Sequence, residues 1–109
     1  MNSSFYVLGL VKGKSKPFSD ERYGTCTHLY LSVLKTDHPE LKGLIDCSCW
    51  NENSNFANRL LYRKALVMIE FSKFKNGYYN GQQRQRILAK TMSMSNWREY
   101  EILMKDRYE

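Results

Sequence analysis

Residues 43–94 read GLIDCSCWNENSNFANRLLYRKALVMIEFSKFKNGYYNGQQRQRILAKTMSM, and this stretch decides the expected fold. It opens with an alternation of period two, which is typical of a half-buried strand. The two sides of that strand carry different side chains: Ile45, Cys47 and Cys49 on one, Asp46, Ser48 and Trp50 on the other. A large ring on the polar side of a strand suggests a platform on which a flat ligand could stack.

The rest of this stretch predicts a short helix and a long hairpin. Apolar residues at helical spacing indicate a helix over 55–63, with Asn53 or Ser54 as its N-cap. Two strand-like runs follow, at 65–74 and 84–94, and the connection KNGYYNGQQ between them contains two Asn-Gly pairs. A strand, a helix and a long basic hairpin in this order are typical of the second half of an OB-fold, an all-β barrel of five strands.

The N-terminal part of the chain predicts the first two strands of the same barrel. Residues 5–14 carry apolar side chains on both sides, as a central strand does, and Gly9 and Gly13 suit a bend or bulge in it. Residues 26–35 alternate cleanly, and their outward side carries Tyr30. This tyrosine therefore joins the tryptophan of the following strand on the side that OB-folds use to bind oligonucleotides.

Residues 15–25 have the Pro, Gly and polar content of a loop. The loop contains Phe18 and Tyr23, which either stack on a base or pack against the rim of the barrel. Three lysines at spacing two lead into it: Lys12, Lys14 and Lys16. They form either a row that faces phosphates or the solvated edge of a loop.

The order of these pieces resembles the bacterial and phage single-stranded DNA-binding proteins. Four pieces carry the resemblance: FYVLGLVKGK at 5–14, IDCSCW at 45–50, NRLLYRKALVMIEF at 58–71 and YYNGQQRQRI at 78–87. The resemblance spans roughly residues 5–94. Two features depart from the family pattern. Lys64 and Phe71 stand about where the family has glycines, and the sequence shows no acidic tail of the kind by which bacterial members recruit partners.

The resemblance implies sequence-independent binding of single-stranded DNA in replication or recombination of a phage or mobile element, by a dimer or tetramer. It implies that Trp50 stacks on a base, that other rings extend the stacking surface and that basic residues neutralise phosphates. The residues expected to bind DNA are Trp50, Tyr30, Tyr78, Tyr79, Phe74, Lys12, Lys14, Lys73, Lys75, Arg84 and Arg86.

Three other interpretations fit the same residues. The tyrosine-rich hairpin could pack on itself or on another subunit. The chain could instead be an OB-fold accessory subunit that binds a polymerase, helicase or recombinase and has weak affinity for DNA. The polymer could also be RNA, because stacking and backbone charge alone need not distinguish the two.

Composition sets the limits of these interpretations. The chain has 109 residues, enough for one domain with a single modest core. Seventeen Lys and Arg against eleven Asp and Glu give a net charge of +6, which favours a polyanion as partner. No run approaches the roughly 20 apolar residues of a membrane span, and residues 1–4 lack a signal-peptide pattern. A cytoplasmic location is the expectation.

The residues that often carry chemistry form no constellation in the sequence. Cys47 and Cys49 share one strand side and Cys26 stands apart, which predicts buried thiols and no metal site, even with His28 and His38 available. There is no nucleophile elbow and no glycine loop to cradle a phosphate. We therefore expect no enzyme activity and no cofactor.

Residues 95–109 have a different character from the 1–94 domain. Ser95 can cap a helix in which Trp97, Tyr100 and Met104 fall at helical spacing, and a strand is the weaker alternative. Because an OB barrel is complete without this segment, its apolar stripe docks on the barrel, forms an oligomer contact or binds a replication protein. The sequence leaves these three options open.

Overall fold

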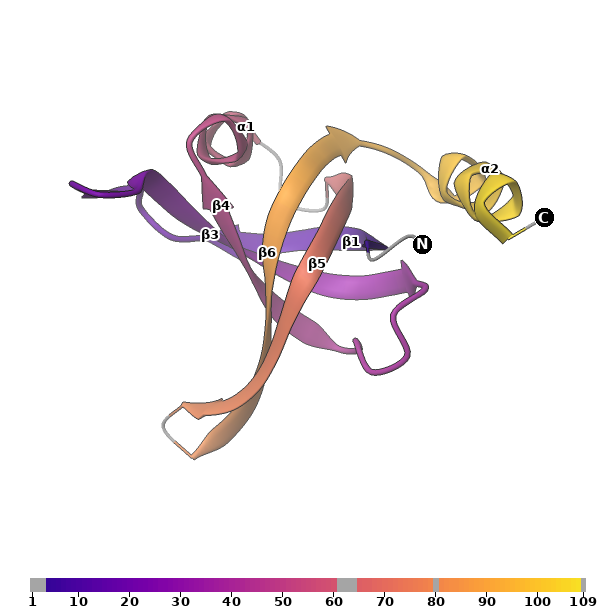
Figure 1. The fold of residues 1–109 in the computed structure, drawn as a ribbon, viewed down its shortest axis with the longest axis horizontal. Helices are drawn as coiled ribbons and strands as arrows, with labels where there is room; N and C mark the ends of the chain where they lie inside the picture. Colours follow the sequence, from indigo (N-terminus) through magenta and orange to yellow (C-terminus); the bar gives the residue numbers. More distant parts are fainter. Residues whose placement is uncertain (1–3, 61–64, 80, 109) are drawn as a thin grey trace.

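The computed structural model describes residues 4–60, 65–79 and 81–108, which fold into six strands and two helices (Figure 1). In chain order these are β1 (Phe5–Lys14), β2 (Phe18–Asp20), β3 (Gly24–Thr36), β4 (Leu44–Trp50), α1 (Glu52–Arg59), β5 (Leu66–Tyr79), β6 (Gln82–Met94) and α2 (Trp97–Tyr108). No helix in these ranges is long and apolar enough to cross a membrane.

Five of the strands form a closed barrel. The order is β1-β5-β6-β4-β3, and β3 pairs with β1 to close the ring. The β4–β6 pair is parallel and the other pairs are antiparallel. This confirms the predicted five-stranded OB-fold with a helix between its third and fourth barrel strands. β2 lies within the predicted loop, and it pairs with the first residues of β3.

The barrel interior is lined by the apolar side of each strand. Val67, Ile69 and Phe71 of β5 are fully buried, as the alternation predicts. All three cysteines are free and buried. The Sγ of Cys49 lies 3.8 Å from that of Cys47, and this contact together with burial raises the pKa of the Cys47 thiol well above its ordinary value. Cys47 and Cys49 thus act as small core side chains.

Register shifts bend two of the strands. In β1 the shifts fall next to Gly9 and Gly13, in line with the predicted bends. A Cβ added at Gly9 would come within 3.2 Å of Leu31, so the two strands approach closely there. In β5 a shift lies between Phe71 and Phe74. Beyond it the ribbon of β5 and β6 leaves the barrel and projects as a long arm (Figure 1).

The hairpin turns later than the sequence predicts. Asn76 and Gly77, the first Asn-Gly pair, belong to β5 and pair with residues of β6. The chain reverses at the second pair, where Gly81 has a φ of 77°. Both strands are longer as a result, because the basic and aromatic residues expected in a loop form a continuous ladder.

The helix α1 begins at Glu52, three residues earlier than predicted. Its N-cap is Asn51, with a φ of 55° and no capping hydrogen bond from its side chain, so the predicted caps Asn53 and Ser54 are wrong. The hydroxyl of Ser54 instead forms a buried 2.7 Å hydrogen bond with Thr27 of β3. The helix ends at Arg59, with an extended Leu60 as its C-cap, so it stops short of the predicted end at Arg63, and residues 61–63 lie outside the described residues.

The C-terminal segment forms a helix, as predicted. Of the three options for its apolar stripe, the structure shows docking on the barrel. Tyr100 of α2 is buried against Leu8 and Met68 on the outer side of β1 and β5. At the helix start the Asn96 side chain accepts a hydrogen bond from the Glu99 amide at 2.9 Å, so Asn96 caps the helix in place of the predicted Ser95.

Candidate nucleic-acid interface

Trp50 and Tyr30 stand on the same outer side of the barrel. The register pairs Cys26 with Trp50 and Tyr30 with Asp46, and directly opposed residues of antiparallel strands point to the same side. The two rings belong to rows four residues apart along β3, which is roughly 13 Å. The common side that the sequence predicts for them is thus confirmed.

Trp50 is part of an aromatic cluster at the outer end of β3 and β4. The rings of Phe18 and Tyr23 lie edge-on to it, with centroid distances of 6.0 and 6.1 Å. Cys26 is buried in the same row, and this burial raises the pKa of its thiol. Both rings thus pack against the tryptophan at the rim and keep a large exposed surface, and stacking of either ring on a base stays a prediction.

Basic residues continue this outer side across the sheet. Asp46 of β4 pairs with Arg86 of β6, and Arg86 pairs with Lys75 of β5. Arg84 and Gly77 form the next row on the same side, towards the hairpin turn. No hydrogen bond or ion pair to another described residue engages the three cationic groups, so they remain available to a ligand.

Arg86 lines several hollows along this side, and two of them are large. One, of about 550 Å³, is lined by His28, Tyr30, Asp46, Arg84 and Arg86. The other, of about 560 Å³, runs from Ser48 over Leu88 to Lys73 and Lys75. We call the residues that line them, together with Trp50, the basic aromatic face.

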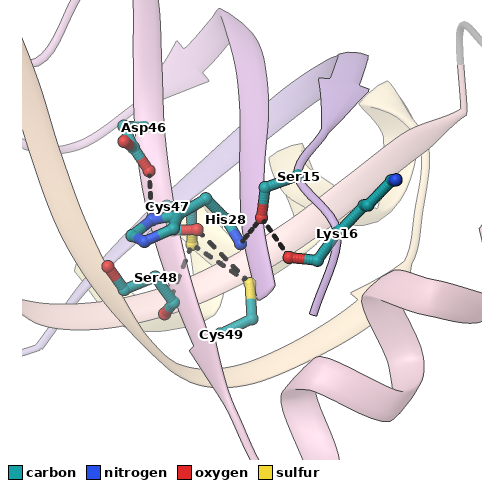
Figure 2. A network of polar contacts seen from close by, with 7 residues as sticks. All are labelled: Ser15, Lys16, His28, Asp46, Cys47, Ser48 and Cys49. Atoms are coloured by element: carbon teal, nitrogen blue, oxygen red, sulfur yellow. Dashed lines mark hydrogen bonds and ion pairs between the residues drawn. The ribbon is translucent and has the colours of Figure 1, made fainter. Parts of the chain in front are cut away.

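The middle of the basic aromatic face contains a cross-strand polar pair. The Nδ1 of His28 lies 2.9 Å from an Oδ1 of Asp46 (Figure 2). The backbone N–H of His28 donates to Ser15 Oγ at 2.9 Å, and its ring stacks on Phe18 at 5.6 Å. The imidazole is therefore held by two contacts and the backbone of His28 by a third, and the ring in turn orients the carboxylate.

This pair is the feature that the sequence prediction misses. His28 and Asp46 both fall on polar strand sides, which is a visible signal. Their contact depends on the register of β3 against β4, where Asp46 is diagonal to His28, and no local pattern specifies that register. Over residues 4–60, 65–79 and 81–108, no group of three or more His, Cys, Asp or Glu side chains is placed to hold a metal ion.

Three aromatic residues of β5 were also predicted to bind DNA, and the structure places them differently from Trp50 and Tyr30. Phe74 lines the hollow of about 560 Å³, but its ring packs against the core, with its centroid 4.4 Å from that of His38. Tyr78 is 79% exposed near the hairpin turn. Alternation along β5 starts its side chain on the other side of the ribbon from Lys75, yet Tyr78 borders a small hollow that Arg84 and Arg86 also line. Tyr79 ends β5, and its side chain is outside the described part of the structure.

The two lysines of β1 differ from the cations of the hairpin. Lys14 donates from Nζ to the carbonyl of Asn58, at the end of α1, at 2.8 Å. This contact supports the helix that follows β4, and it points the lysine away from Tyr30. Lys12 is exposed. The structure therefore does not gather the lysine row of the sequence into the basic aromatic face.

Comparison with known proteins adds a likeness of fold. No model of a protein family matches the chain, and no curated protein matches it in sequence. A solved structure, the small single-stranded DNA-binding protein from Streptomyces coelicolor, is similar with a TM-score of 0.58 and 13% sequence identity. The match covers 90% of this chain and 99% of the other. The chain and this Streptomyces coelicolor protein therefore have similar folds.

Proposed function

We propose that the protein binds single-stranded DNA without regard to sequence, in replication or recombination of a phage or mobile element. One observation carries the proposal: Trp50 and Tyr30 share an outer barrel side with cations of β5 and β6 that have no partner among the described residues. Each base stacked on a ring contributes about 1–3 kcal/mol, whatever the base. The similar fold of a small single-stranded DNA-binding protein supports the same conclusion.

The arrangement of rings and cations favours a single strand over a duplex. Stacking on Trp50 or Tyr30 requires an unpaired base with a free face, and a duplex hides these faces in its own stack. Lys75, Arg84 and Arg86 then lie where the backbone of the strand passes. Binding should weaken with salt, with a slope of log K against log salt of about −0.7 for each phosphate neutralised.

The remaining predicted residues have supporting roles in this proposal. Lys73 lies beside Lys75 and extends the phosphate path. Tyr78 and Tyr79 could hold a strand that continues along the hairpin arm, or another subunit of a dimer or tetramer. We assign no base contact to Phe74, because its ring is engaged with His38.

A second candidate function is that of an accessory subunit that binds a replication protein through α2. The observation that favours it is that the docked helix leaves three large side chains exposed: Trp97, Ile102 and Tyr108. Replacing Ile102 with Asp should abolish capture of such a partner and leave DNA binding intact. Deletion of the helix is a poorer test, since it would uncover Leu8 and Met68.

The two tryptophans make the main proposal directly testable. We would titrate the protein with a thymidine oligonucleotide of about 35 nucleotides and follow tryptophan fluorescence. Trp97→Phe leaves Trp50 as the only reporter, and quenching should persist. Trp50→Phe leaves Trp97, which lies on α2 beside Lys35, and quenching should disappear.

Affinity is measured separately, by anisotropy of a labelled oligonucleotide. Trp50→Ala should weaken binding by about 1–3 kcal/mol, or roughly 5- to 150-fold. A duplex of the same length and an RNA strand serve as competitors, and the RNA result decides which polymer is preferred. Absence of binding by the wild-type protein at low salt would contradict the proposed function.

A further inference from the structure

We propose that Asp46, oriented by His28, reads the edge of one base and favours a base with an exocyclic amino group over thymine. The inference rests on the proposed function and adds a single selective position to an otherwise indifferent surface. Its starting point is the presence of one carboxylate in a groove whose other charged side chains are Arg84 and Arg86.

A carboxylate at this place is unfavourable for a purely phosphate-binding groove. Like charges repel, and the repulsion grows as water is excluded by a bound strand. The phosphates should therefore pass along Arg84 and Arg86, and an uncharged part of the nucleotide should face Asp46. The part that fits an acceptor is the amino group of cytosine, adenine or guanine, because a carboxylate accepts hydrogen bonds from such groups.

The carboxylate is also held in place before any ligand arrives. Asp46 is only 8% exposed, and one of its oxygens accepts the hydrogen bond from His28 Nδ1 (Figure 2). The ring of His28 is fixed in turn by its stack on Phe18. No other described residue donates to the second oxygen, Oδ2. One free acceptor in a fixed direction is what readout of a base edge requires.

The position of Asp46 relative to the stacking rings supports this role. Tyr30 is directly opposite Asp46 on β3, and both line the same groove. A base that rests against Tyr30 would thus present its edge to the neighbouring strand.

The test compares oligonucleotides of deoxycytidine and thymidine on the wild-type protein and on Asp46→Asn. The amide keeps the shape and still offers His28 an oxygen, but it replaces the free acceptor with a donor. We measure the ratio of the two dissociation constants for each protein. Asp46→Asn should reduce the preference for cytosine over thymine at least fivefold relative to the wild-type protein, in line with about 1 kcal/mol for one base contact. Binding of thymidine should stay the same or become tighter.

Glu70→Gln is the matched control. It removes the same charge from the outer side of β5, where Glu70 contacts Thr91 and Lys90, so it should change both affinities equally. If Asp46→Asn leaves the cytosine-to-thymine ratio unchanged, or if Glu70→Gln alters it as much, the inference is wrong. Failure of the wild-type protein to bind either oligonucleotide would instead remove the proposed function itself.

Discussion

The outside of the barrel has one covered part and one open part, and a single strand contributes to both. The first half of β5 presents Leu66 and Met68, which pack under α2. The second half presents Lys73 and Lys75 to the hollows of the basic aromatic face. The register shift between Phe71 and Phe74 separates the two halves.

The comparison shows what makes an outer surface a binding face. Apolar side chains such as Leu8 and Met68 would favour aggregation if they were exposed, and the chain covers them with its own helix. Half-exposed rings among cations stay in water without that cost, because their polar neighbours keep the surface solvated. The open part is therefore the one suited to a charged and aromatic ligand.

Two arginines illustrate the same difference. The guanidinium of Arg107 on α2 lies 3.1 Å from Asp37, and both side chains are nearly buried, at 11% and 7% exposure. It also lies over the ring of Tyr6. Arg86 is exposed and has no such partner among the described residues. A net charge of +6 alone does not reveal which cations are free to bind.

The largest expected effect tests whether the two parts are independent. Tyr100→Ala removes the buried ring of α2, so we expect the free energy of unfolding to fall by about 3–5 kcal/mol, measured by urea denaturation. Ile102→Ala, at a 52% exposed position of the same helix, should cost less than about 0.5 kcal/mol. DNA affinity of the folded Tyr100→Ala protein should stay within twofold of wild type. A large loss of affinity would mean that the covered part supports the open one.

A smaller loss of stability is expected when the ion pair under α2 is broken. Asp37→Asn leaves the guanidinium of Arg107 without its counter-charge, which should cost about 1–3 kcal/mol of unfolding free energy. Thermal unfolding with Arg107→Gln and the double variant measures the coupling between the two side chains. Additive losses would show that the two side chains do not interact in solution.

The open part should respond in affinity rather than stability. Replacing Lys75 and Arg86 with Gln should reduce the salt slope of DNA binding by about 1.4, and affinity at 0.1 M salt by roughly 10- to 30-fold. The control removes the same charge from α2, with Arg98 and Lys105 changed to Gln, two exposed positions. If both double variants lost affinity equally, net charge alone would explain DNA binding, and the open part would have no special role.

The smallest effect is a pH dependence confined to the covered part. Burial first, then the nearby Asp37 and Tyr108, raise the pKa of Tyr100 to about 12. An unfolded tyrosine ionises near pH 10, so between pH 10 and 12 the unfolded chain binds fewer protons and stability falls as pH rises. The loss should be about 1–2 kcal/mol in urea denaturation. Tyr100→Phe should not show this component of the alkaline loss, and an identical pH profile in both proteins would contradict it.

Much of this fold could be predicted because strand alternation is a local property. The inward and outward sides of β3, β4 and β5 follow from neighbouring residues, and so does the outward position of Trp50. The ends of the helices and strands were harder to predict. Asn76 and Gly77 look like a turn but lie in a paired ladder, because the second Asn-Gly pair closes the hairpin.

By itself, the sequence determined the order of the elements, the buried side of each strand and the supply of rings and cations. The tertiary structure alone decided which of them meet. It placed His28 on Asp46, turned Phe74 towards His38, used Lys14 to hold α1 and covered one outer side with α2. The physical reason is range: alternation is set within a few residues, whereas register and docking depend on contacts between segments far apart in the chain.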